Sequence, residues 1–171
     1  STRKSRQILT NTTSAKAANV MNKTTTSKVK DIVEEAVQSN TTDKVSTILV
    51  ETDKKKVAEV LLESETGTSA KVIKEMGKVN LNGAAERVEE AVKKKLGELN
   101  EETKAKYEQK LKETIENPSL TADDLADLFT EIANLPNTPS TVAEIFEIIE
   151  VSRTVEVVDT MIVKDKLSEI G

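Results

Sequence analysis

The run Lys56-Val57-Ala58-Glu59-Val60-Leu61-Leu62-Glu63-Ser64 contains the pattern on which the predicted fold rests. The pattern begins with a small or apolar residue, continues with two residues that are usually polar, and ends with two apolar residues. Apolar side chains at offsets of 0, 3 and 4 lie on one face of an α-helix, whereas a strand requires alternation at every second residue. The run therefore predicts a short amphipathic helix.

The same pattern recurs along the chain. Other copies begin at Ser5, Ala17, Val29, Val45, Ser69, Leu125, Val142 and Thr154. The first six copies start 12, 12, 16, 12 and 12 residues apart, which makes two units of 40 residues. Aligned without gaps, the two units share nine residues, four of them at apolar positions, where for example Ile8 matches Ile48 and Val20 matches Val60. This distribution indicates an internal duplication.

The turns between the copies are rich in Thr, Ser, Asn and Asp. A step of 12 residues leaves about eight or nine for a helix, which is too short to be stable alone in water. We therefore expect each helix to stack on its neighbours. We also expect the turn residues to accept hydrogen bonds from the N–H groups at the start of the next helix. The predicted capping segments are 12–14, 24–27, 40–43, 52–53 and 66–68.

Residues 84–116 depart from this rhythm. A copy begins at Ala84, but Glu89 occupies its second apolar position and the helix is predicted to continue to about Leu99. A second, more polar helix is expected from Asn100 to about Ile115. We predict a long helical hairpin here that projects from the stack, or else a linker. The expected regions of one continuous module are thus 1–83 (short-helix repeats), 84–119 (hairpin or linker) and 120–171 (further repeats).

The composition excludes several kinds of chemistry. The chain has no His, Cys or Trp, so it has no imidazole base, no thiolate nucleophile, no Cys/His zinc site and no disulfide. With 36% hydrophobic but 2% aromatic residues, the expected core is aliphatic. No run of 18 apolar residues predicts a membrane span. The first residue is Ser1 and not Met, which suggests a fragment of a larger protein.

Charge is distributed unevenly along the chain. Residues 1–30 carry a net charge of +7 without any acidic residue, and the remainder carries −12. A basic segment can bind nucleic acid or anionic lipid, but this one has no aromatic residue on which bases could stack. We therefore expect no nucleic-acid partner. The basic end is expected to pack against acidic neighbours in the same molecule or the next one.

Carboxylates near residue 125 are the candidate metal ligands. Asp123, Asp124, Asp127 and Glu131 fall close together at the start of a predicted helix, and their oxygens suit Mg²⁺ or Ca²⁺. The alternative interpretation is a solvated acidic face that interacts favourably with the helix dipole. The sequence predicts no catalytic residue and no cofactor, because no carboxylate pair, Ser or Thr has a recognisable partner for acid–base or nucleophilic catalysis.

Three sites match the N-glycosylation pattern, and all three fall in predicted turns. They are Asn11, Asn22 and Asn40. Their position is consistent with surface glycans. The same turns also require Asn and Thr as capping residues, so both interpretations stay open.

The runs 56–64, 69–76 and 141–149 resemble the short-helix repeats in the amino-terminal domain of MgtE-type magnesium transporters and of the flagellar motor switch protein FliG. Those repeats read roughly as Ala-Ala-Glu-Val/Ile-Leu-Glu-Glu-Met. The resemblance, over 5–76 and 125–162, implies an all-α, right-handed superhelix of short helices that packs against other domains. In MgtE the domain responds to Mg²⁺ at acidic surfaces shared with a neighbouring module. The Thr- and Asn-rich, cysteine-free turns also look like helical repeats of archaeal-type surface proteins.

The sequence as a whole predicts a non-enzymatic helical-repeat module of a larger protein, extracellular or on the cell surface. It would act as a spacer, or as a scaffold that binds a protein or a neighbouring domain through its concave face. The alternative is a cytosolic regulatory domain that senses divalent cations, as the resemblance to MgtE implies. The lack of cysteine is compatible with either location.

Overall fold

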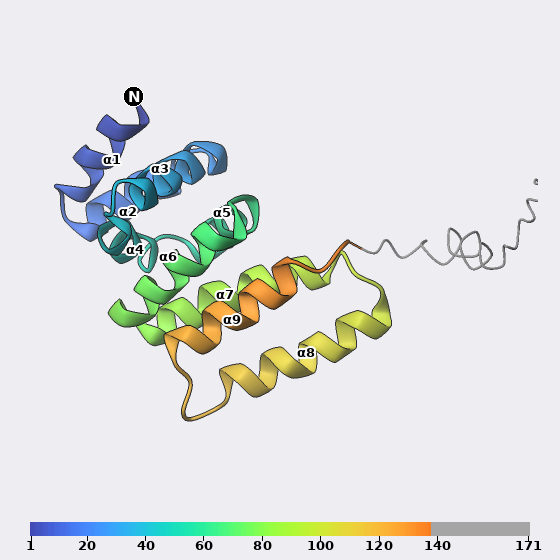
Figure 1. Ribbon diagram of the computed structural model, residues 1–171. Coiled ribbons are helices and arrows are strands. Elements are labelled where there is room, and N and C mark those ends of the chain that lie inside the picture. Colours follow the sequence, from blue (N-terminus) through green and yellow to red (C-terminus); the bar gives the residue numbers. More distant parts are fainter. Residues whose placement is uncertain (138–171) are drawn as a thin grey trace, which may run out of the picture. The chain divides into compact units, whose positions relative to one another are not determined.

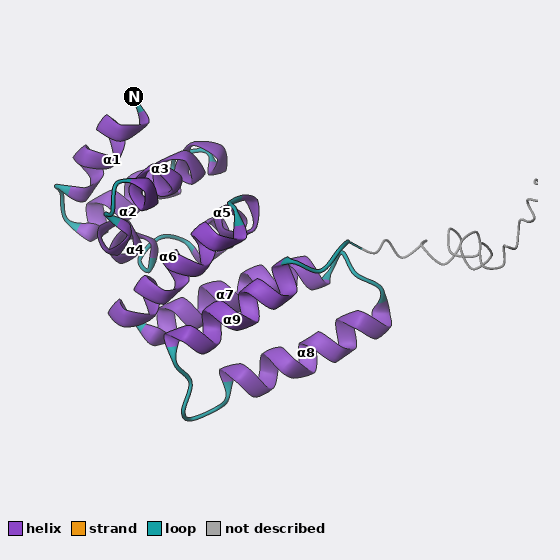
Figure 2. Ribbon diagram, viewed as in Figure 1, coloured by secondary structure: helices purple, strands orange, loops and turns teal. Residues whose placement is uncertain are grey.

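The computed structural model describes residues 1–137, which form nine α-helices and no strand (Figures 1 and 2). The predicted all-α class is confirmed. Residues Ser1–Gly97 and Glu102–Pro136 form one compact unit. The pattern copies at Val142 and Thr154 lie outside the described residues. The helices are α1 (Thr2–Thr10), α2 (Ser14–Asn22), α3 (Thr26–Gln38), α4 (Thr42–Leu49), α5 (Lys54–Glu63), α6 (Thr66–Val79), α7 (Leu81–Leu96), α8 (Glu101–Ile115) and α9 (Ala122–Ala133).

Each of the short helices packs against the helix two further along the chain. α1 packs against α3, α3 against α5 and α5 against α7, while α2 packs against α4 and α4 against α6. The helices thus form an odd-numbered and an even-numbered row, which also touch each other through α3 and α4 or α6 and α7. The apolar pattern positions fill the interior, and Leu49, Val60 and Leu61 are among the side chains with almost no exposure.

The predicted hairpin at 84–116 differs from the structure in its first helix. α7 does not project, because it packs against α5, α6 and α9. Ala84, Val88, Ala91 and Val92 give it a buried apolar face, and Glu89 lies beside that face, partly exposed. α7, which spans the predicted boundary at residue 83, therefore belongs to the same packed unit as the helices before it.

α8 is the helix that interrupts this regular packing. α9, and not α8, packs against α6 and α7 and so takes the next place in the even-numbered row. α8 lies alongside α9 (Figure 1), and of its own side chains it buries Tyr107 and Leu111. Its narrow apolar stripe explains this position, because a helix inside the rows needs an apolar face wide enough for several neighbours.

Most predicted caps are present. The side chains of Thr13 and Thr25 each accept a hydrogen bond from the backbone N–H three residues later, and the Asp53 carboxylate accepts two at the start of α5. The prediction was wrong at α6, which begins after Glu65 without a side-chain cap.

The turn between α3 and α4 is also not capped as predicted. The Thr41 hydroxyl does not cap α4 but donates to the Ala36 carbonyl at 3.2 Å. Asn40 adopts a left-handed conformation with φ of 57°, and the Thr41 N–H donates to the same carbonyl at 2.8 Å. This arrangement ends α3, whose 13 residues account for the wider spacing of 16 before the next copy.

Arg87 joins α7 to the end of α4. Its side chain is buried, and its guanidinium donates to the carbonyls of Leu49 at 2.9 Å, Gly83 at 3.0 Å and Thr52 at 2.6 Å. Burial lowers the pKa of Arg87, while exposed Glu86 approaches it at 3.7 Å. A cation at the carboxyl end of a helix also interacts favourably with the helix dipole.

Replacing Arg87 with Met should therefore destabilise the fold. The substitution keeps much of the side-chain volume but leaves buried carbonyls without their charged donor, which we expect to cost about 3 kcal/mol. Chemical denaturation of the purified chain measures the change. The control is Arg3→Met at an exposed site of α1, and equal effects of both substitutions would contradict the structural role of Arg87.

Gly77 allows α6 and α9 to approach closely. A Cβ at this position would overlap the Ala122 Cβ and lie 3.0 Å from the Ala122 Cα. At Gly67, in the first turn of the same helix, an added Cβ would meet no atom within 4 Å.

These two glycines give a matched pair of substitutions. Gly77→Ala should lower the free energy of unfolding by about 1–2 kcal/mol, because overlap with Ala122 outweighs the gain in helix propensity. Gly67→Ala should leave stability unchanged or raise it by up to about 1 kcal/mol. Thermal unfolding followed by circular dichroism compares them. A stabilised Gly77→Ala variant would show that the two helices do not meet here.

Candidate functional site

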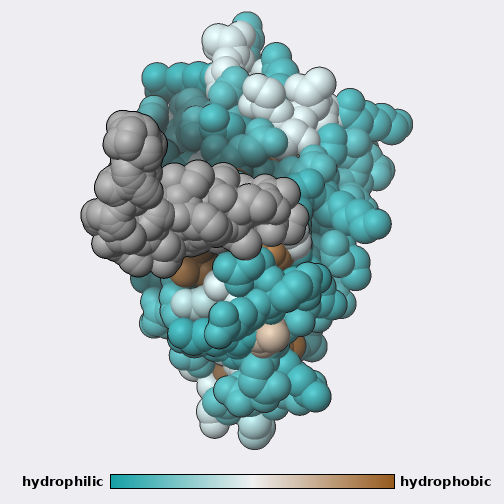
Figure 3. Space-filling view, turned by 90° about the vertical axis from the view of Figure 1, so that its right-hand side faces the viewer, coloured by the Kyte–Doolittle hydropathy of each residue, from teal (hydrophilic) through white to brown (hydrophobic). Residues whose placement is uncertain are grey.

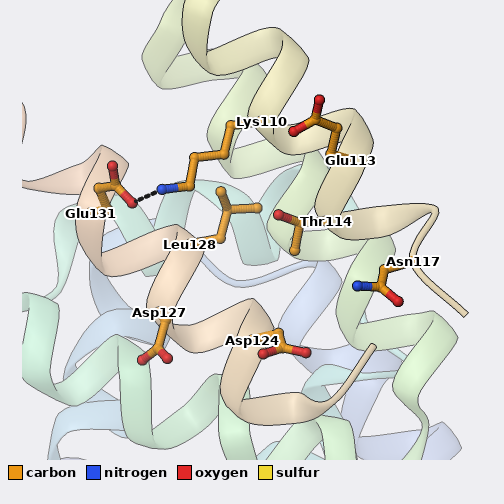
Figure 4. Close-up of a pocket in the computed structure, with 8 residues that line it drawn as sticks. All are labelled: Lys110, Glu113, Thr114, Asn117, Asp124, Asp127, Leu128 and Glu131. Carbon is orange, nitrogen blue, oxygen red and sulfur yellow. Dashed lines mark hydrogen bonds and ion pairs between the residues drawn. The ribbon is translucent and has the colours of Figure 1, made fainter. Parts of the chain in front are cut away.

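An open groove with a volume of about 350 Å³ runs between α8 and α9. Figure 4 shows side chains from both helices facing it, with Leu128 between them. Leu128 is buried, while the charged side chains around it are exposed. The lining residues are Lys110, Glu113, Thr114, Asn117, Asp124, Asp127, Leu128 and Glu131.

The structure brings three of the four predicted metal ligands to this groove. Asp124, Asp127 and Glu131 are spaced three and four residues apart, which places them on one face of α9. Asp123 lies on another face of the helix. It lines a separate groove with Lys71, Lys74 and Lys78 of α6, among other residues.

Two of these carboxylates have structural partners. Asp124 accepts a hydrogen bond from the Thr121 N–H at 3.0 Å, and the Thr121 hydroxyl accepts one from the Asp124 N–H at 3.1 Å. This capping box satisfies N–H groups at the start of α9. Glu131 forms a hydrogen-bonded ion pair with Lys110 of α8, which raises the pKa of the Lys110 ammonium group. Both side chains of this pair are about half exposed, so it contributes little to stability.

Metal binding stays a prediction. Within residues 1–137, no three carboxylates are gathered in a way that could hold a metal ion. Mg²⁺ requires near-octahedral oxygen ligands at short distance, so carboxylates spread along a groove do not provide such a site. The further acidic series Glu144, Glu147 and Glu150 lies outside the described residues.

The three candidate glycosylation sites are exposed at helix ends. Asn11 follows α1, and Asn40 has the left-handed conformation that ends α3. The Asn22 side-chain oxygen accepts a hydrogen bond from the Asp53 N–H at 2.8 Å, which joins the end of α2 to the start of α5. Asn22 and Asn40 thus have structural roles as turn residues. Glycosylation itself stays a prediction, which the mass of the protein purified from its source would test.

Sequence reasoning missed an exposed apolar surface at the beginning of the chain. Ile8 and Val20 occupy pattern positions that were expected to be buried, yet they are 63% and 50% exposed. The position of their helices was the available signal. The outermost helices of a repeat stack have neighbours on one side only.

No family model, no curated protein and no solved structure matches the chain. The resemblance to the repeats of MgtE and FliG therefore stays an expectation. In residues 1–137 no helix combines the length and the apolar character that are needed to cross a membrane.

Divalent cations should not stabilise the part of the chain that the structure describes. A ligand that binds the folded state raises the midpoint of thermal unfolding, but no carboxylate cluster in the described residues is arranged to bind one. We expect millimolar MgCl₂ or CaCl₂ to have the same effect as NaCl of equal ionic strength. A rise specific to the divalent salts that Asp127→Asn abolishes would instead establish a cation site in the groove.

Proposed function

We propose that the chain is a non-enzymatic helical-repeat module of a larger, surface-exposed protein, in which it serves as a spacer or a protein-binding scaffold. The observation that carries this proposal is the packing of each short helix against the helix two further along. Such contacts are local and repetitive, so a stack can be extended without a new core. We further propose that the two rows wind into the right-handed superhelix that the resemblance implies.

The grooves support a binding role over a catalytic one. The groove between α8 and α9 is open and combines acidic, basic and apolar side chains. A second open groove between α5 and α7 has the same mixed character, with Lys55, Glu59, Glu90 and Lys94 among its lining residues. Open, mixed surfaces suit contact with a protein chain, whereas small-molecule sites are concave and mostly apolar.

The ionisable side chains that are most enclosed serve the fold. Arg87 donates to backbone carbonyls, and Arg6 of α1 donates to the Glu35 carboxylate of α3 at 2.7 Å. The hydrogen bond from Arg6, together with one from Ser39, lowers the pKa of Glu35. A catalytic site commonly requires a titratable group with a strongly shifted pKa that faces a cavity. Arg6, Glu35 and Arg87 do not line either of the two grooves described above.

A location at the cell surface is supported by the exposed Asn-X-Thr sites and by the hydrophilic surface. On the face drawn in Figure 3, the described residues are mainly hydrophilic. The alternative of a cytosolic module that responds to divalent cations has one observation in its favour: Asp124, Asp127 and Glu131 lie along one groove, although they do not form a cluster that could hold a metal ion. The cation titration described above separates the two.

A membrane-impermeant amine crosslinker, applied to intact cells of the source organism, tests the proposal. Exposed lysines such as Lys16, Lys28 and Lys112 can react with it. A surface scaffold should form crosslinked species with neighbouring proteins before lysis, because its lysines are accessible and its partners are adjacent. An abundant cytosolic protein, which should react only after lysis, is the control. Crosslinking of this chain only after lysis would contradict the surface location.

A further inference from the structure

The two copies of the internal duplication differ in what covers the same apolar positions. Ile8 and Val20 are 63% and 50% exposed, whereas their counterparts Ile48 and Val60 are 2% and 0% exposed. Ile8 and Ile48 are the same residue type, and so are Val20 and Val60. The difference therefore comes from the surroundings of the helices and not from the side chains.

The packing of the helices explains this difference. In its row α4 lies between α2 and α6, and α5 lies between α3 and α7. Their counterparts α1 and α2 each have one row neighbour among the described helices, α3 and α4 respectively. The outer sides of α1 and α2 thus expose apolar positions that an adjacent helix covers in the second copy.

Lysines flank both exposed apolar side chains. Lys4 lies one turn before Ile8, Lys16 lies one turn before Val20, and Lys23 lies one turn after it, so each shares a helix face with its apolar neighbour. These three lysines are exposed and form no ion pair with other residues in 1–137. The exposed sides of α1 and α2 that carry Lys4, Ile8, Lys16, Val20 and Lys23 are together called the end face below.

We propose that the end face binds a short amphipathic helix with apolar residues at offsets of 0, 3 and 4 and acidic residues beside them. This inference rests on the proposed function as a protein-binding scaffold and specifies one binding surface and its partner. The duplication supports a helix as the occupant, because α4 and α5 have a helix on both sides in their rows and their equivalent side chains are buried. The charge supports an acidic one, because residues 1–30 contain seven basic and no acidic residues.

The chain itself contains a segment with this chemistry. Residues 142–150 read Val-Ala-Glu-Ile-Phe-Glu-Ile-Ile-Glu, which combines the apolar pattern with three acidic residues. This segment lies outside the described residues. A fluorescent peptide of residues 140–151 is therefore the probe, added to the intact chain and followed by fluorescence anisotropy at low and high salt.

We expect saturable binding that weakens as salt rises, because exposed charges attract each other less when screened. The double substitution Ile8→Ser and Val20→Ser should weaken binding at least about tenfold, since two aliphatic side chains lose their buried contact. Both positions are exposed, so the midpoint of thermal unfolding should not change. Lys4→Glu with Lys16→Glu should weaken binding by a similar factor.

The matched control is Val79→Ser, because Val79 is 49% exposed but lies on α6. It should leave the affinity unchanged.

The proposal would be overturned if the peptide does not bind, or if a scrambled peptide of the same composition binds equally well. It would also be overturned if the end-face substitutions leave binding unchanged, or if the chain binds anionic vesicles and not the peptide. If the peptide fails while crosslinking on intact cells still finds neighbours, only the end face is disproved. If the peptide binds but crosslinking on intact cells finds no neighbours, the end face is supported as a binding surface and the proposed location at the cell surface is disproved.

Discussion

No helix in the described part of this chain can depend on its own backbone hydrogen bonds for stability. The helices have between 8 and 16 residues, near or below the length at which an isolated helix is marginal in water. Each must bury an apolar face against others, and the pattern supplies a face of suitable width. Packing against the helix two further along the chain satisfies this requirement repeatedly, and the two rows are its consequence.

The same requirement explains where α8 and α9 lie. α9 has five buried side chains and takes the next place in the even-numbered row, where Gly77 of α6 lets the two backbones approach. α8 has a narrow apolar stripe and lies outside the rows. Its surroundings are accordingly more polar, and the groove it shares with α9 is lined by charged side chains. The interruption of the repeat by α8 thus produces a groove lined by charged side chains, and the first helices of the repeat leave Ile8 and Val20 exposed.

These two features favour different kinds of contact. Along the groove, Glu131 pairs with Lys110 and Asp124 caps its own helix, so carboxylates that could hold a cation already have other partners. On the end face, Lys4, Lys16 and Lys23 flank apolar side chains and form no ion pair with the described residues. Lysines without ion pairs beside exposed apolar side chains can attract a partner of opposite charge, whereas the paired charges of the groove already have partners within the chain.

The sequence by itself determined that the chain is helical, where most helices begin, and that the core is aliphatic. These properties depend on residues three or four positions apart, such as Val57 with Val60 and Leu61, or Thr25 with the Lys28 N–H. The tertiary structure alone decided which helices are neighbours. It placed α7 inside the unit, buried Ile48 while leaving the identical Ile8 exposed, and separated Asp123 from Asp124, Asp127 and Glu131. It also aimed Arg87 at carbonyls 35 and 38 residues away. A local pattern specifies the face that a helix must bury, but identical faces do not specify which helix covers them, because that depends on contacts between distant parts of the chain.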